Sequence, residues 1–430
     1  MTGVVSQGAG GRNDKRPRPA LRLAQAVFLA MIFSLGWMKN PVSIGGLGAF
    51  PSDFLFLVTA GLWLLALLRR ETDLRWHRVY WLLGAYFLAM TLSVEASADP
   101  QRSVFKLATQ AYLLALAILT FNLVRTLKDL ERVARWWVAA AAAVACLGVG
   151  TLLLFPLLGR DSILSWPLHH FGTLPPGPYP RLELTFSFPA MLVNYLTVAL
   201  AMLLIGRPLG WFSKDFAWAV GAGVFLSALF ALAPAFGGML FFLGAWTWQS
   251  KRDESPGLAR AALLVGGAMP VFGVLLAAAT PILHPTDPFL IRFAGITLAP
   301  SVRLLAWIEA SQNFLTSPVF GRGIGIAPVS VVYEQANLCG GVCVTDAHNT
   351  FLSFAVQTGI IGLVPMLGLV LFVALKLRGT KTDAIVFGLA IAWLAGFALQ
   401  GLVGSFEDAR HLWIVLGLLL SASQFKPSAT

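Results

Sequence analysis

Charged residues are scarce in this chain of 430 residues. Asp, Glu, Lys and Arg make up 12% of the sequence, whereas 57% is hydrophobic and the mean hydropathy is +0.75. Soluble domains are typically about 25% charged and about 45–50% apolar. The shortage of charge excludes an ordinary soluble fold, because this much apolar surface needs lipid as its solvent. The composition predicts an all-α polytopic membrane protein.

Cysteine is also rare, with three residues in the whole chain. Cys339 and Cys343 form the sequence CGGVC, which in an oxidising compartment favours a small disulfide loop over free thiols. A zinc site needs more soft ligands nearby, and the sequence offers none there. Cys146 lies inside an apolar run and is expected to be a small packed residue. We expect no metal and no cofactor.

Acidic residues are fewer than basic ones, 20 against 31, which gives a net charge of +11. The basic residues occur in short clusters between apolar runs, as in loops that stay on the cytoplasmic side of a membrane. This pattern predicts a lipid bilayer as the partner and excludes nucleic acid.

Twelve apolar runs are candidates for membrane-spanning helices, which need about 20 apolar residues. If both termini are cytoplasmic, 22 of the 31 Lys and Arg residues fall on the cytoplasmic side. The runs are residues 21–38, 52–69, 79–96, 104–124, 136–157, 186–206, 216–233, 235–249, 261–281, 351–376, 383–404 and 411–424.

The predicted organisation follows from these runs. A basic cytoplasmic tail of residues 1–20 precedes helices 1–9 in residues 21–281, which include an outer loop at 158–185. A second, larger outer loop covers residues 282–350 between helices 9 and 10. Helices 10–12 follow in residues 351–424, and residues 425–430 form a cytoplasmic tail.

The larger outer loop contains the residues best suited to chemistry. Apolar residues recur at helical spacing in SVRLLAWIEASQNF, which predicts a helix lying on the membrane face. Arg303 in this helix is either a snorkelling charge or an anion clamp. His348 stands before the next helix, which Asn349 or Thr350 is expected to cap. His348 is either a general base or a polar junction residue.

Further polar residues lie on the same predicted side. Arg322 belongs to the glycine-rich PVFGRGIGIAP, which lacks the features of a phosphate loop and predicts a tight turn with Arg322 reaching a ligand. Arg181 leads into a helix whose Asn194 is expected to face the bundle interior. Adjacent His169 and His170 are more typical of a polar loop than of a metal site.

The last outer turn, SFEDARH, is unusually polar for its position between two apolar runs. Glu407, Asp408 and Arg410 are expected to pair with one another or to line the same cavity.

Three segments together resemble the O-antigen ligase and Wzy-type polysaccharide polymerase superfamily. They are RLELTFSFPAMLVNYL from Arg181, SVRLLAWIEASQNFLTSPVFGRGIG from Ser301 and AHNTFLSFAVQTGIIGL from Ala347. Their order and spacing also fit, and the resemblance covers about residues 50–425.

The resemblance implies a metal-independent glycosyltransferase in the bacterial inner membrane, acting at the periplasmic face. Such an enzyme moves a glycan from undecaprenyl diphosphate to a hydroxyl of lipid A-core or of another glycan. By the resemblance, Arg303 neutralises the diphosphate leaving group, Arg181 and Arg322 assist, and His348 orients or deprotonates the acceptor. Asn349 is included in the substrate-binding set.

The sequence departs from the family pattern in two places. The family often has an arginine at the start of the helix near residue 235, where this chain reads ALAPAFGGMLFFLGAW, and an acidic residue where this chain has Gln357. Either Arg292 or Arg410 takes the place of the missing arginine, or the chain is a divergent member with altered activity.

Alternative functions remain open at this stage. Within the superfamily, a ligase and a repeat-unit polymerase use the same donor and differ in the acceptor. A transporter or flippase for a lipid-linked glycan is an alternative of another class, although the sequence shows no inverted repeats and little charge inside the predicted spans. A non-catalytic scaffold is the third alternative.

Overall fold

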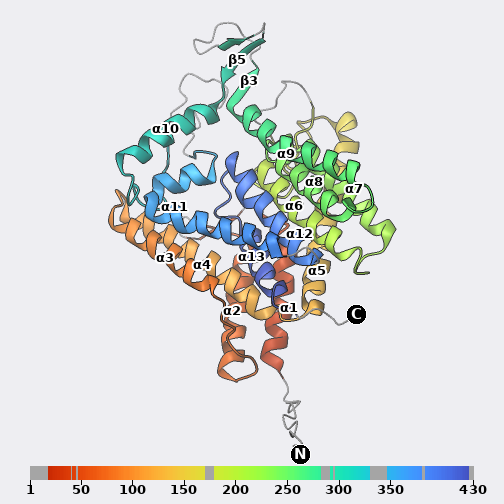
Figure 1. Cartoon of the computed structure of the whole chain (residues 1–430), viewed down its shortest axis with the longest axis vertical. Coiled ribbons are helices and arrows are strands. Elements are labelled where there is room, and N and C mark those ends of the chain that lie inside the picture. The colour runs from red at the N-terminus through yellow and green to blue at the C-terminus, as the bar shows by residue number, and fades with distance from the viewer. Residues whose placement is uncertain are drawn as a thin grey trace, which may run out of the picture.

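The computed structural model describes residues 18–39, 41–44, 47–169, 179–281, 291–293, 296–329, 346–379 and 383–425. These residues form a helical bundle with two small antiparallel sheets (Figure 1). The helices are α1 (Pro19–Ser34), α2 (Pro51–Leu68), α3 (Val79–Glu95), α4 (Pro100–Leu123), α5 (Leu127–Leu158), α6 (Pro189–Gly206), α7 (Lys214–Phe230), α8 (Phe236–Lys251), α9 (Pro256–Ala278), α10 (Val302–Thr316), α11 (Thr350–Lys376), α12 (Ala384–Trp393) and α13 (Arg410–Ala422).

Every predicted apolar run coincides with one of these helices, and the protein is a multi-pass membrane protein. In the part of the chain that the structure describes, seven helices are long and apolar enough to cross a membrane. They are Pro51–Leu68, Pro100–Leu123, Leu127–Leu158, Pro189–Gly206, Pro256–Ala278, Thr350–Lys376 and Ala384–Leu402. Three shorter apolar helices are α1, α3 and α13. The helices are therefore confirmed, while the count of twelve spans stays a prediction.

Some of the apolar helices lie in the centre of the bundle and others line its surface. Within its most apolar stretch, 83% of α6 is buried, against 22% of α2 and of α9. Figure 1 shows α12 and α13 enclosed by other helices, and every residue of α13 after Arg410 is buried. The outer helices present their apolar side chains outward, as expected of lipid-facing surfaces. Cys146 is one of these exposed residues on α5, so the expectation that it is packed is wrong.

Glycine allows α8 and α9 to cross backbone against backbone. A Cβ atom at Gly244 would stand 2.3 Å from the Ala262 carbonyl oxygen, and one at Gly266 would stand 2.9 Å from that of Leu240. Small residues at helix crossings are the usual device in membranes, where packing replaces the hydrophobic effect as the driving force.

The α12 helix continues as a π-helix, Leu394–Leu399, and a 3₁₀ turn, Gln400–Leu402. The prediction that Asn194 faces the interior is confirmed. Its Nδ2 donates to the Gly396 carbonyl within the π-helix at 2.8 Å, and its Oδ1 lies 2.5 Å from His411 Nε2. The irregular turns of this segment are thus bonded to polar side chains of α6, and one of these, Asn194, is in turn bonded to His411 of α13.

The connections between helices lie at two ends of the bundle. Hydrogen bonds and ion pairs join connections that lie at the same end. We call the end that carries α10 the α10 end, and the other the opposite end. Contacts at the α10 end join Lys39 with Glu183, Asp53 with Arg410, and Lys106 with Asp408. Contacts at the opposite end join Leu21 with Glu71 and Arg75 with Phe121, Val124 and Gln424.

The range of the predicted outer loop, 282–350, contains strands and a helix among its described residues. It contains β4 (Ile291–Phe293), β5 (Ile296–Pro300) and α10, and β5 pairs with both β4 and β3 (Ala279–Pro281) in the order β3-β5-β4. A two-stranded sheet of β1 (Val42–Ile44) and β2 (Leu47–Ala49) connects α1 to α2. Figure 1 shows β3 and β5 beyond the helices, with α10 beside them.

Candidate functional site

The α10 helix lies across the end of the bundle and is anchored at its start to α9. The backbone N–H of Ser301 donates to the Ala278 carbonyl at 3.1 Å, and its hydroxyl donates to the Ala277 carbonyl. The same hydroxyl caps α10 by accepting a hydrogen bond from Leu304 N at 3.4 Å. The predicted helix on this stretch is confirmed.

Arg303 lies in the first turn of α10 and faces the beginning of α11. Ala306 and Ala310 follow it at helical spacing and pack against Ala347 and Val356. Because the contact side chains are small, α10 comes close to α11. A positive charge in the first turn opposes the helix dipole, so Arg303 does not stabilise its own helix.

The guanidinium of Arg303 is incompletely bonded. Its Nε is buried and has no hydrogen-bond partner among the described residues. Burial lowers the pKa of Arg303, and the nearby negative charge of Asp346 opposes that shift. A buried donor without a partner costs about 1–3 kcal/mol or more, and an anionic ligand would remove this cost.

His348 precedes α11 in a strained backbone conformation. Its φ of 48° lies in the left-handed region, which residues other than glycine rarely adopt and which often marks functional sites. The expected cap is confirmed: Asn349 Oδ1 accepts from Phe351 N at 3.0 Å and from Leu352 N at 3.1 Å. Thr350 N donates to the Gly404 carbonyl at 3.0 Å, so the turn after α12 fixes this strained junction.

Asp346 holds His348 in place. Its Oδ1 accepts hydrogen bonds from the Ser405 hydroxyl at 2.6 Å, the Ser353 hydroxyl at 3.2 Å and the backbone N–H of His348 at 3.2 Å. Its Oδ2 lies 3.5 Å from His348 Nδ1. Partial burial lowers the pKa of His348, Asp346 raises it, and Arg303 lowers it. The imidazole is therefore held near a carboxylate and kept neutral near pH 7.

Arg181 brings a second guanidinium to the same region. Its Nε donates to the Ala231 carbonyl at 3.3 Å. Burial and the positive charge of Arg303 lower the pKa of Arg181 to about 10, with smaller opposing effects from Tyr179 and Glu183. Two arginines within range of each other gather positive charge in this region. The structure thus places Arg181 and His348 each within electrostatic range of Arg303, and the common cavity expected for the three residues stays a prediction.

The glycine-rich loop is held against a break in α11 by four backbone hydrogen bonds. Arg322 N and Gly323 N donate to the carbonyls of Val356 and Gln357 at 2.8 and 3.1 Å. In return, Ile360 N and Ile361 N donate to the carbonyls of Pro318 and Val319 at 2.8 and 3.3 Å. We call residues 317–325, bonded in this way to α11, the glycine clamp.

Two glycines make the glycine clamp possible. Gly359 interrupts α11 with φ 64° and ψ −164°, and a Cβ there would stand 2.2 Å from the Val319 carbonyl oxygen. Gly321, with φ 72°, would place a Cβ 2.4 Å from the backbone of Gln357. The Gln357 side chain adds a bond by accepting from Gly325 N at 2.6 Å. The clamp fixes the far end of α10, so both ends of the helix that carries Arg303 are anchored.

A second polar cluster lies beside the turn after α12. Asp408 pairs with Lys106 of α4, and its Oδ1 accepts from Gln110 Nε2 at 2.7 Å. Glu407 is buried, and its Oε2 has no hydrogen-bond partner in the described structure. Burial raises the pKa of Glu407 to about 8; Asp408 and Asp346 act in the same direction, and Lys106 opposes them.

Other predicted site residues lie elsewhere or outside the described residues. Arg410 pairs with Asp53, Nε to Oδ1 at 2.6 Å and Nη2 to Oδ2 at 2.8 Å, so it pairs with neither Glu407 nor Asp408, and its expected role with substrate gains no support from these contacts. Arg292 is in β4, and its side chain lies outside the described residues, as do Cys339, Cys343 and His170.

His169 contacts an acidic residue. Its Nδ1 lies 2.5 Å from Glu183 Oε2, and Glu183 also pairs with Lys39. In the ranges that the structure describes, no three His, Cys, Asp or Glu side chains gather in one place.

Sequence reasoning missed several residues of the network. Lys106 and Gln110 stand four residues apart in an otherwise apolar stretch of α4, which was the available signal that one face of this helix is polar. Ser405 gave no signal, because its bond to Asp346 depends on how two distant turns meet.

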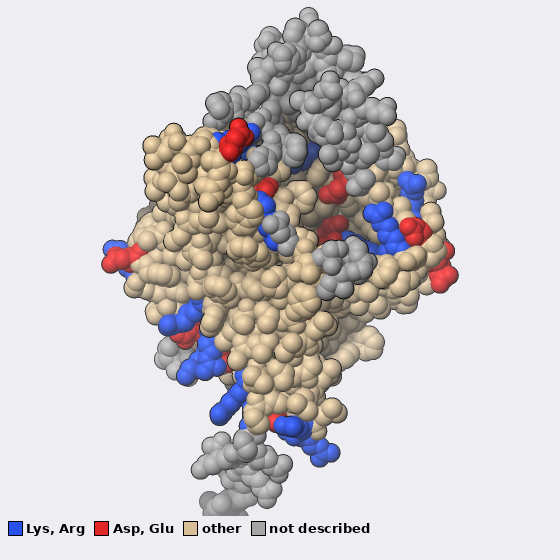
Figure 2. Space-filling model, turned by 180° about the vertical axis from the view of Figure 1, so that it is seen from behind, with Lys and Arg blue, Asp and Glu red and all other residues tan. Residues whose placement is uncertain are grey.

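Charged side chains gather in particular parts of the molecular surface. Figure 2 shows a hollow in the upper half of the molecule that contains both acidic and basic side chains, while most of the surface around it is neither. A second gathering of basic side chains lies near the lower end. The group formed by Arg303, His348 and Asp346, with a buried cation, an imidazole and a carboxylate, is suited to binding an anion and removing a proton beside it.

Comparison with known proteins agrees with the resemblance. A family model described as O-antigen ligase matches residues 184–367. This segment includes Arg303, Asp346, His348 and the glycine clamp, and it begins three residues after Arg181. No curated protein matched the chain.

Proposed function

Residues 184–367 place this chain in the O-antigen ligase and polymerase superfamily of membrane glycosyl-transferring enzymes, and from this premise we propose its reaction. The protein transfers a glycan from a polyprenyl diphosphate, undecaprenyl diphosphate in bacteria, to an acceptor hydroxyl. The α10 end then faces the periplasm, and the bundle lies in the inner membrane. The incompletely bonded guanidinium of Arg303 beside Arg181 and His348 is the observation that carries the proposal.

In the proposed reaction, the acceptor oxygen attacks the anomeric carbon of the glycan, and the bond from this carbon to the diphosphate oxygen breaks. The electron pair of that bond stays on the diphosphate, whose growing charge Arg303 and Arg181 stabilise. The acceptor proton passes to His348. The products are the transferred glycan and polyprenyl diphosphate, with no metal or cofactor in the proposed scheme.

The state of His348 supports the role of proton acceptor. A lowered pKa keeps the imidazole neutral at physiological pH, so it is able to take a proton. Asp346 beside Nδ1 favours the tautomer that leaves Nε2 as the acceptor, and its negative charge stabilises the imidazolium that forms. Asp346 is thus a positioning residue in this scheme.

The test compares Arg303→Ala and His348→Ala with Arg102→Ala in a strain lacking the chromosomal gene. Arg102 is an exposed arginine at the start of α4 and serves as the matched control. Surface glycan is analysed on gels at equal protein level. We expect both site variants to lose transfer and to accumulate the lipid-linked glycan in the outer leaflet, while Arg102→Ala keeps normal glycan.

Other outcomes would identify the alternatives. Acceptors left bare indicate a ligase, and acceptors carrying a single repeat indicate a polymerase. Lipid-linked glycan trapped on the cytoplasmic face in the site variants would show a flippase and contradict the transferase proposal. Normal glycan in both site variants would also contradict it.

A further inference from the structure

One face of α4 carries three polar side chains, although the helix is long and apolar enough to cross a membrane. Ser103, Lys106 and Gln110 follow one another at spacings of three and four residues, which places them on the same side of the helix. A polar side chain on a membrane helix is costly to keep and usually has a function. All three form bonds with segments around His348.

The outer end of this face contacts the glycine clamp. The Ser103 hydroxyl donates to the Ile324 carbonyl at 2.5 Å. A Cβ atom at Gly325 would stand 2.8 Å from the Cβ of Lys106, so the backbone of the clamp packs directly on this lysine. Because the clamp anchors the far end of α10, α4 supports the helix that carries Arg303.

The middle of the face bonds both carboxylate oxygens of Asp408. Lys106 Nζ pairs with Oδ2, and Gln110 Nε2 donates to Oδ1 at 2.7 Å. Asp408 belongs to the turn after α12 and comes from a distant part of the sequence. The face therefore fixes this turn against α4.

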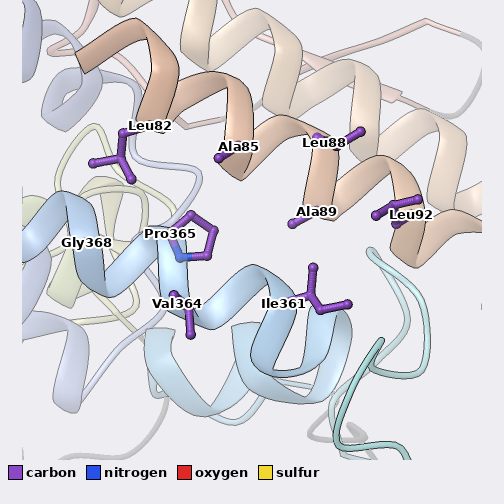
Figure 3. Close-up of a pocket in the computed structure, with 9 residues that line it drawn as sticks. All are labelled: Leu82, Ala85, Leu88, Ala89, Leu92, Ile361, Val364, Pro365 and Gly368. Carbon is purple, nitrogen blue, oxygen red and sulfur yellow. The ribbon is translucent and has the colours of Figure 1, made fainter. Parts of the chain in front are cut away.

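Gln110 also links α4 to the start of α11. The Tyr86 hydroxyl of α3 donates to Gln110 Oε1 at 3.2 Å, and the Tyr86 ring stacks on Phe354 of α11 with centroids 5.2 Å apart. The pocket that Figure 3 shows between α3 and α11 is lined by apolar residues and glycine, so its lining contributes no polar side chain to this connection.

The turn after α12 transmits this anchorage to the site. Its Ser405 hydroxyl donates to Asp346 Oδ1 at 2.6 Å, and its Gly404 carbonyl accepts from Thr350 N at 3.0 Å. Asp346 Oδ2 lies 3.5 Å from His348 Nδ1. A series of contacts thus leads from α4 to the imidazole.

Lys106 is also a positive charge placed among acidic residues. Asp346, Glu407 and Asp408 all lie within electrostatic range of it. Glu407 is buried, and its Oε2 has no partner among the described residues. Without Lys106, these carboxyl groups would face one another without their counter-charge, and the turn would also lose a bond to α4.

We propose that Lys106 is a positioning residue: by bonding Asp408, it holds the turn after α12 and so keeps Asp346 beside the proposed base. This inference rests on the proposed function, in which His348 takes the acceptor proton. Loss of Lys106 therefore slows transfer but leaves the anion site at Arg303 in place.

The test is a double-mutant cycle between Lys106→Met and Asp346→Asn. Lipid-linked glycan extracted from the strain lacking the gene is the donor, membranes of that strain supply the acceptor, and the protein is assayed in detergent. We expect Lys106→Met to lower kcat roughly tenfold or more and to leave KM for the donor unchanged. Added to Asp346→Asn, it should cost less than about threefold more, because both changes release the same imidazole. Losses that multiply would overturn the proposal.

Three variants serve as controls. Lys106→Arg keeps the charge and should keep most of the rate, and Arg102→Met, which removes an exposed cation of the same helix, should match the wild type. Asp408→Asn removes the ion pair from its other side and should reproduce the loss of kcat, which keeps the test decisive if Lys106→Met does not fold. Equal losses in Lys106→Met and Arg102→Met would overturn the proposal, as would a normal rate in Asp408→Asn.

Hydrogen exchange separates this inference from the proposed function, because it needs no turnover. We expect the amides of His348 and Thr350, which are bonded to Asp346 and to the turn after α12, to exchange at least about tenfold faster in Lys106→Met than in Arg102→Met. This result without any glycan transfer by the wild type would support the positioning and contradict the transferase. Normal transfer with unchanged exchange in Lys106→Met would contradict the positioning alone.

Discussion

Two pairs of half-buried arginines at opposite ends of the bundle show different bonding. At the opposite end, Arg75 Nη1 donates to the carbonyls of Phe121 and Val124 at 2.9 and 3.2 Å, and Arg125 Nε donates to Asn122 O at 2.9 Å. At the α10 end, Arg303 Nε has no partner among the described residues. Burial lowers the pKa of Arg75, and Arg125 lowers it further. The same two causes, burial and a neighbouring guanidinium, lower the pKa of Arg181.

The difference separates structure from function. Both pairs are buried and lie beside another guanidinium. Neither burial nor a neighbouring positive charge alone therefore identifies a functional site. The two pairs differ in how many of their N–H donors form hydrogen bonds. The arginines of the opposite end use their donors to join α3, α4 and the end of α13. Arg303 has a buried donor with no partner among the described residues. A buried, unpaired donor is costly, and a bound anion is the simplest reason for a protein to keep one.

The largest expected effects come from truncating one arginine of each pair. Arg303→Ala should lower glycan transfer roughly 10²–10³-fold, because in the proposed reaction it removes a donor that stabilises developing charge, and it should leave the thermal transition unchanged or higher. Arg75→Ala should lower the free energy of unfolding by roughly 1–3 kcal/mol, because it leaves carbonyls unpaired. Transfer assays and thermal unfolding in detergent measure both quantities.

Arg303→Lys is the control for charge alone, and we expect it to recover only part of the activity because lysine lacks the guanidinium fork. If Arg303→Ala destabilised the protein as much as Arg75→Ala does, the distinction between the two pairs would not hold.

The next effect concerns the glycine clamp that anchors α10. Gly359→Ala should lower the free energy of unfolding by about 2–3 kcal/mol, because a methyl group would stand 2.2 Å from a carbonyl oxygen at a positive φ. Gly61→Ala on α2 is the control, since no atom lies within 4 Å of the added methyl there, and alanine favours a helix. Equal thermal transitions for the two variants would show that the break in α11 is not held as described.

Asp346→Asn tests how His348 is held. We expect transfer to fall roughly tenfold to a hundredfold, a part of the ~10²–10⁴ that general base catalysis supplies. Asp346 raises the pKa of His348, so removing its charge should lower that pKa. The acidic limb of the pH–rate profile should then shift to lower pH. A uniform loss of rate with an unshifted profile would indicate a purely structural role.

The last expected effect concerns how the stability of the protein depends on pH. Because the pKa of Glu407 is raised to about 8, the folded protein holds a proton that the unfolded chain releases above about pH 4.5. Stability should therefore fall as pH rises from about 4.5 to 8. Glu407→Gln should remove this dependence and be more stable than the wild type at about pH 8.5, where the wild-type carboxyl must lose its proton in a buried place. Thermal transitions at about pH 5 and 8.5 measure it.

The exposed Glu95 provides the control for that measurement. Glu95→Gln should follow the wild type at both pH values. A wild-type transition that rises over this pH range would contradict the assignment of a protonated Glu407.

The sequence predicted the helices well, because lipid demands long apolar runs and the runs end at prolines and charged turns. It also indicated Arg303, His348 and the cap at Asn349, since these residues interrupt an apolar pattern at recognisable positions. It did not predict that Arg410 pairs with Asp53 or that Ser405 bonds to Asp346. Those contacts join residues far apart in the chain, and periodicity says nothing about which turns meet.

Because both of its ends are anchored, α10 bridges two membrane helices, α9 and α11. Its start is bonded to the end of α9, and the loop at its far end is bonded to the break in α11. The position of Arg303 relative to His348 is therefore set by the lateral spacing and tilt of α9 and α11. A bilayer thin enough to tilt these two helices apart would move the cation away from the imidazole. In the proposed reaction, transfer rates in lipids of increasing chain length should therefore pass through an optimum, because bilayer thickness sets the spacing between Arg303 and His348.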